Sequence, residues 1–183
     1  MAINEYDPHA VQALLTEIVA ELAPDEDLAP FLLLAAGCEA GGVLTLDARL
    51  FQPPRSIRFY RDQLPGLIRQ TGADRAMLVT STWVADIDPL NLDELAAFRR
   101  HIASGGRLFE WPTRCDAISA LRVERNAPPR TFVATLERHV DRAPTIRGWH
   151  EDGGFEPELE RALQLGVGAD VTGRSVRYDS VLQ

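Results

Sequence analysis

The sequence predicts an α+β fold, with a largely antiparallel sheet of about five strands and helices packed mainly on one face. Short apolar runs bounded by proline or glycine are typical of strands, and longer segments with apolar residues every three or four positions are typical of helices. Both patterns occur along the chain. Because 183 residues are an ordinary length for one domain, we expect residues 1–183 to form a single globular domain with a tail from about residue 168.

The first elements are a helix and a hairpin. The helix begins at Pro8, which suits a first helical position because it has no N–H, and it ends before Pro24. Residues 31–36 are apolar and follow Pro30, so we expect a strand there. A glycine turn then leads to a returning strand over residues 43–46.

A helical segment and a central strand follow. Residues 56–71 have helical periodicity, and Pro65 interrupts it, which predicts two short helices or a kink. The strand over Ala76–Val84 is apolar on both faces at its start, which is typical of a central strand covered on both sides. Asn91 or Asp93 caps the next helix, which a pair of glycines closes.

The second half is predicted to contain a second hairpin and a last helix. Apolar and polar residues alternate over 116–124 and 131–137, so each segment is expected to be a strand. The segment Asn126–Pro129 between them predicts the turn of an antiparallel hairpin. Residues 157–165 are predicted to form a short helix.

Residues 73–84, which end in Trp83 and Val84, stand between a helical segment and a later β-hairpin. This order resembles a group of uncharacterised bacterial proteins in which an apolar strand often ends in Glu-Ala-Trp and a strand pair follows. Here Ser81 and Thr82 stand where Glu-Ala would be, and the helix before the hairpin is fuller. The resemblance covers residues 56–150, implies an α+β fold and implies no activity.

All 19 basic side chains are arginine, because the chain contains no lysine. This excludes lysine Schiff-base chemistry, pyridoxal phosphate attachment and the lysine of a phosphate-binding P-loop. The net charge of −8 makes the protein acidic, which disfavours binding to nucleic acid and to anionic membranes. We expect no cofactor, no membrane association and a cytoplasmic location, since the amino terminus has no basic signal region.

Three tryptophans, Trp83, Trp111 and Trp149, each follow a strand-like run. One interpretation is that they line one rim of a ligand-binding pocket, with Glu110 and His150 supplying its polar groups. The alternative is that each indole closes part of the core.

Histidines and carboxylates are densest near the end of the second hairpin. His139, His150 and Asp152 are the candidate catalytic residues of a small hydrolase, which a metal ion would assist. Against this, no pair of histidines or cysteines has the spacing of a metal motif, and we expect no metal. Alternation from Thr135 and Glu137 would instead place His139 on a solvent-facing strand surface.

Arg55, Arg58 and Arg61 are spaced to share one helical face beside two aromatic residues, an arrangement that is able to bind phosphate groups. The acidic net charge favours the alternative, an ordinary solvated helix face.

Taken together, these features favour a non-enzymatic binding or regulatory protein that acts through a protein–protein surface. Its partner is expected to be another protein or a second copy of the chain rather than nucleic acid. The hydrolase is the alternative function.

Overall fold

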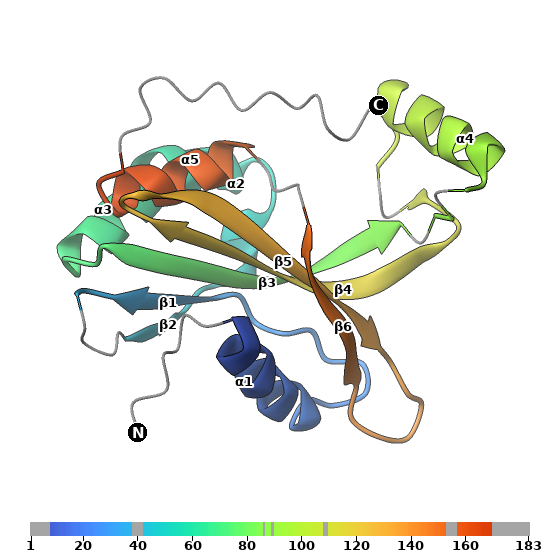
Figure 1. Cartoon of the computed structure of the whole chain (residues 1–183), viewed down its shortest axis with the longest axis horizontal. Coiled ribbons are helices and arrows are strands. Elements are labelled where there is room, and N and C mark those ends of the chain that lie inside the picture. Colours follow the sequence, from blue (N-terminus) through green and yellow to red (C-terminus); the bar gives the residue numbers. More distant parts are fainter. Residues whose placement is uncertain are drawn as a thin grey trace.

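A computed structural model describes residues 8–37, 42–85, 87–88, 90–107, 110–152 and 157–169, without the side chains of Pro8, His9 and Asp152. Its centre is an antiparallel sheet of six strands in the order β2-β1-β3-β4-β5-β6 (Figure 1). The strands are β1 (Phe31–Ala35), β2 (Val43–Thr45), β3 (Arg75–Ala85), β4 (Arg114–Glu124), β5 (Ala127–Glu137) and β6 (Thr145–Asp152). The helical elements are α1 (Pro8–Ala20), η1 (Ala48–Phe51), α2 (Arg55–Arg58), η2 (Phe59–Gln63), α3 (Leu64–Gln70), α4 (Leu92–Ala103) and α5 (Pro157–Gly166). The predicted α+β fold is therefore confirmed, with one strand more than expected.

Strand β3 lies at the centre of the sheet and is buried on both faces. It pairs with β1 on one side and with β4 on the other. Ala76 and Leu78 point into one hydrophobic cluster, and Met77 and Val79 point into the other. None of the four is exposed to solvent. The expectation of a central strand covered on both faces is confirmed, because successive side chains of a strand point to opposite sides.

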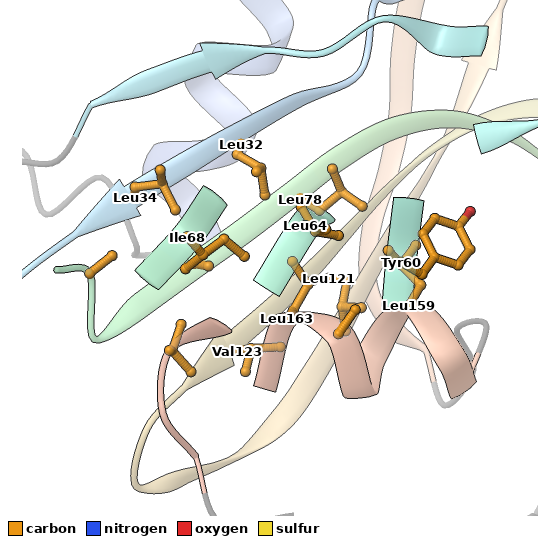
Figure 2. Close-up of a cluster of buried hydrophobic side chains, with 14 of the residues drawn as sticks. Leu32, Leu34, Tyr60, Leu64, Ile68, Leu78, Leu121, Val123, Leu159 and Leu163 are labelled. Atoms are coloured by element: carbon orange, nitrogen blue, oxygen red, sulfur yellow. The ribbon is translucent and has the colours of Figure 1, made fainter. Parts of the chain in front are cut away.

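One face of the sheet is covered by the helical elements α2, η2, α3 and α5. Leu64 and Ile68 from this helical layer are fully buried against Leu78 and Leu121 from the sheet (Figure 2). Leu163 brings α5 into the same cluster. This layer contains most of the helical elements of the described chain, as expected for helices mainly on one face.

The other face of the sheet is covered by α1. Val11, Leu15 and Val19 recur on one side of this helix and are buried. They belong to a cluster that includes Phe31 and Ile118 from the sheet. Figure 1 shows α1 on the opposite side of the sheet from α5.

Arg138 holds the segment between α1 and β1 against the sheet. Its Nε atom donates to Asp116 Oδ2 at 2.5 Å, and its Nη1 atom donates to the carbonyl oxygen of Glu26 at 2.9 Å. It also pairs with Asp27. The acidic segment Asp25–Asp27, which follows α1, is therefore partly neutralised by a basic side chain more than a hundred residues away in the sequence.

The helical segment after η1 differs in detail from the expectation. Residues 55–70 are helical throughout, so the interruption predicted at Pro65 is wrong, and the irregular turn is the π-helical segment η2 before it. Pro65 lies in the first turn of α3, where a residue without an N–H costs little.

The second hairpin also differs from the expectation. The predicted turn Asn126–Pro129 is wrong, because only Arg125 and Asn126 lie between the strands and both prolines belong to β5. Prolines are tolerated there because they stand at the beginning of the strand, beside an irregularity in its pairing with β4.

Strand β6 was not predicted, because its sequence does not alternate regularly. Gly148 has a φ of +64°, and the pairing with β5 shifts between Val133 and Thr135. Such a bulge changes which face the following residues occupy. A pattern of period two is therefore interrupted in the middle of this strand.

Two glycines in the helical layer give a test of its packing. A Cβ atom at Gly166 would lie 2.8 Å from Ile68 Cβ, whereas a Cβ atom at Gly66 would have no neighbour within 4 Å. We expect Gly166→Ala to lower the free energy of unfolding by about 1–3 kcal/mol through overpacking. Gly66→Ala should raise it by about 0.5–1 kcal/mol, because alanine is the better helix former.

Urea denaturation followed by far-UV circular dichroism measures both changes. Gly66→Ala serves as the control for a general effect of adding a methyl group to this layer. Equal changes of the same sign would contradict the proposed close contact between α5 and α3.

Candidate functional site

Trp149 and Trp111 pack against different aromatic residues, and Trp83 is partly exposed. Trp149 is half-buried on β6 and stacks on Phe132, with ring centroids 5.7 Å apart and planes 10° from parallel. It packs against the core under α1. Trp83 is 46% exposed on β3, where it lies opposite Asp116. Trp149 therefore closes part of the core. For this residue, the alternative interpretation of the tryptophans is the correct one.

Trp111 and Glu110 lie together beside α4. The Trp111 ring contacts the edge of Phe98 at a centroid distance of 5.1 Å and contacts His101 at 5.5 Å. Glu110 accepts a hydrogen bond from the Arg107 backbone N–H at 2.8 Å. The carboxylate of Glu110 is 3.9 Å from His101 Nε2, so these residues join α4 to the loop that follows it.

Helix α4 packs only lightly against the rest of the described chain. Asn91 caps its amino end by accepting from the Glu94 backbone N–H at 3.2 Å, which decides between the two predicted caps. None of its residues is buried. Leu92 is 73% exposed, Ile102 is 44% exposed and Leu90, just before the helix, is 88% exposed. Figure 1 shows α4 beyond the ends of β3 and β4, away from both helical layers.

Most of the apolar residues of α4, apart from Ala97 and Phe98, lie along one stripe. Residues three or four positions apart share a face of a helix. In α4, apolar or small residues occur at this spacing both before and after Arg99. The stripe consists of Leu92, Leu95, Ala96, Arg99, Ile102 and Ala103. We call these residues, together with Leu90, the α4 surface.

The candidate catalytic histidines do not come together. His139 follows the end of β5, and its Nε2 atom lies 3.0 Å from Thr145 Oγ1. The expectation that it shares a strand face with Thr135 and Glu137 is therefore wrong, because the strand ends before it. His150 is exposed on β6 opposite Val133. Five residues of strand separate Thr145 from His150, a distance on the order of 15 Å.

The residues that the structure describes contain no group of three or more histidine, cysteine or acidic side chains arranged to hold a metal ion. The side chain of Asp152 and the predicted tail beyond residue 169 lie outside the described residues.

A surface hollow of about 330 Å³ lies between η2 and α5. One of the predicted phosphate-binding arginines, Arg61, lines it, whereas Arg55 and Arg58 are exposed outside it. Arg161 from α5 supplies a second guanidinium group. The lining residues are Tyr60, Arg61, Glu158, Arg161, Ala162 and Leu165.

Sequence reasoning missed the α5 side of this hollow. Glu158, Arg161, Ala162 and Leu165 follow the spacing of one helix face, which was visible in the sequence. Nothing local indicated that this face would lie beside η2. On the same helix, burial raises the pKa of the Glu160 carboxyl group.

Comparison of this chain with protein-family models, with curated proteins and with solved structures finds no match. The resemblance of residues 56–150 to a bacterial protein group therefore stays a prediction. None of the described helices has both the length and the apolar composition needed to cross a membrane.

The different surroundings of the tryptophans predict different costs of removal. Trp149→Ala should lower the free energy of unfolding by about 2–3 kcal/mol, because it removes a half-buried ring stacked on Phe132. Trp83→Ala should lower it by about 1 kcal/mol or less, because almost half of the side chain is already in water. Urea denaturation followed by circular dichroism measures both values without depending on tryptophan fluorescence. Equal losses would contradict the assignment of Trp149 to the core.

Proposed function

We propose that this chain is a non-enzymatic binding protein that acts through a protein–protein surface, and that its α4 surface joins two copies of the chain. The observation that carries the proposal is a helix of 12 residues with no buried residue and with large apolar side chains in water. Monomeric proteins seldom expose such residues together, and contiguous apolar patches mark interaction sites.

The spacing of the α4 surface supports a partner helix. Leu95 and Ile102 are seven residues apart, and Ala96 and Ala103 repeat the same interval. Apolar positions at this interval form the seam of paired helices, in which side chains of one helix fit between those of the other. Ala96 lies in the middle of the stripe, where a small side chain lets two helix axes approach closely.

Charge supports a second copy in antiparallel orientation. Acidic residues, Asp93 and Glu94, occupy the first turn of α4, and basic residues, Arg100 and His101, occupy the last turn. In an antiparallel pair the first turn of each helix meets the last turn of the other. Asp93 and Arg100 are seven residues apart and so flank the stripe on the same side. Each carboxylate would therefore meet a guanidinium group of the other copy, and a twofold axis makes the contact twice.

The opposite side of α4 is held by its own chain. Phe98 and His101 contact Trp111, so the helix is fixed on the loop that follows it and presents its apolar stripe outward. One helix pair buries less area than a standard interface of about 1,600 Å², so we expect a reversible dimer with a dissociation constant on the order of 1–100 μM.

The hydrolase alternative has no support from the geometry of the described side chains, which do not include that of Asp152. Among them, neither His139 nor His150 forms a salt bridge with a carboxylate.

Sedimentation equilibrium over a range of concentrations tests the apolar part of the proposal. Leu92→Glu should raise the dimer dissociation constant by about a hundredfold, because it places a carboxylate in the apolar seam of the pair, where a charged group loses its hydration. Ile57→Glu is the matched control, since Ile57 is 52% exposed on α2 and lies outside the α4 surface. A wild-type protein that remains monomeric up to about 500 μM, well above the expected dissociation constant, would disprove the proposed dimer.

Exchanging the charges of Asp93 and Arg100 tests the antiparallel orientation of the two α4 helices. Asp93→Arg should weaken the dimer by about tenfold, because two guanidinium groups then face each other at each end. The double variant Asp93→Arg/Arg100→Asp should restore the affinity, since it re-forms opposite-charge pairs across the same flank. Circular dichroism of the variants verifies that α4 remains helical. Failure of the double variant to recover would exclude the antiparallel arrangement.

A further inference from the structure

The hollow between η2 and α5 is separate from the α4 surface and has the composition of a ligand site. Its floor includes Tyr60, which is 4% exposed and belongs to the buried cluster of the helical layer. Figure 2 shows Tyr60 at one end of that cluster with its hydroxyl group directed away from the leucines. Ala162 and Leu165 add apolar surface from α5. A volume of about 330 Å³ lies within the range of small-molecule sites.

The charged groups of the hollow do not neutralise one another. Arg61 and Arg161 are exposed arginines, and in the described residues neither forms a salt bridge with a carboxylate. Glu158 lines the same hollow and has no salt bridge there either. Elsewhere in the described chain, several arginines are paired, such as Arg130 with Glu151 at 2.6 Å. The hollow thus offers two guanidinium groups, one carboxylate and an apolar floor.

We propose that this hollow binds a small zwitterion that carries a carboxylate, an amine and an apolar side chain, the chemical class of an apolar α-amino acid. The two guanidinium groups suit the ligand carboxylate, because arginine recognises planar carboxylates through paired N–H donors. Glu158 accepts hydrogen bonds from the ligand ammonium group. The apolar side chain of the ligand lies over Tyr60, Ala162 and Leu165.

The charge balance selects this class over a simple anion. A ligand with only a carboxylate would bring its negative charge beside Glu158 and leave that group without a partner. A ligand with only an amine would leave both arginines without one. A zwitterion satisfies both sets of groups, and a site built to bind a polar group rejects an analogue that lacks it.

Isothermal titration calorimetry of the full chain with three related compounds tests the proposal. L-phenylalanine carries all three groups, 3-phenylpropanoate lacks the amine and 2-phenylethylamine lacks the carboxylate. We expect L-phenylalanine to bind with a dissociation constant on the order of 0.1–1 mM, as suits a ligand of its size, and each analogue to bind about tenfold more weakly or worse. Equal binding of 3-phenylpropanoate and L-phenylalanine, or no binding of L-phenylalanine at about 10 mM, would overturn the proposal.

Single substitutions test which charged side chains of the hollow bind the ligand. Arg161→Leu and Arg61→Leu should each weaken L-phenylalanine binding by about tenfold, whereas Arg58→Leu, an exposed arginine on α2 outside the hollow, should leave it unchanged. Glu158→Gln should weaken L-phenylalanine but not 3-phenylpropanoate, a difference that general damage to α5 would not produce. Equal losses of affinity for L-phenylalanine and 3-phenylpropanoate in Glu158→Gln would contradict the role of Glu158. A loss of L-phenylalanine affinity in Arg58→Leu equal to that in the other two arginine variants would contradict the roles of Arg61 and Arg161.

This site does not depend on the proposed dimer. The Leu92→Glu variant should bind L-phenylalanine as the wild type does, so failure of either proposal can be recognised separately.

Discussion

Strand β3 imposes the constraint on which the rest of the structure depends, because it must be shielded from water on both faces. Met77 and Leu78, which are adjacent in sequence, point to opposite sides of the sheet and are both fully buried. Burying each of these side chains contributes about 1.5–3 kcal/mol relative to leaving it in water. A single helical layer would leave one of the two faces exposed. The chain therefore places α1 on one face and the layer formed by η2, α3 and α5 on the other.

This requirement explains why α4 is different from the other helices. Strands β3 and β4 are neighbours, and the segment between them contains a helix that has no remaining sheet face to cover. An isolated helix of this length is marginally stable in water, so α4 depends on its Asn91 cap and on the contact between Phe98 and Trp111. A second copy packed on the outward stripe would supply the burial that its own chain does not.

The absence of lysine gives the charged groups of this protein a common character. Every cation outside the histidines is a guanidinium group, which binds carboxylates through several directed N–H donors rather than as a mobile point charge. Arg138 uses this property within the fold, where it contacts Asp116, Asp27 and the backbone of the segment after α1. In the hollow the same chemistry is available to a ligand, because the arginines there have no carboxylate partner in the described chain.

The sequence by itself determined most of the helices and strands, with β6 and η1 as exceptions, and that β3 is central, because these properties depend mainly on neighbours in the chain. Periods of two and of three to four residues record which side of each element is buried. Only the tertiary structure decided the pairing of β6, whose glycine and bulge disturb its alternation, and the different ring partners of Trp111 and Trp149. It also decided that Arg61 and Arg161, a hundred residues apart, line the same hollow. Such contacts depend on how η2 and α5 pack on the sheet, and no local pattern specifies that packing.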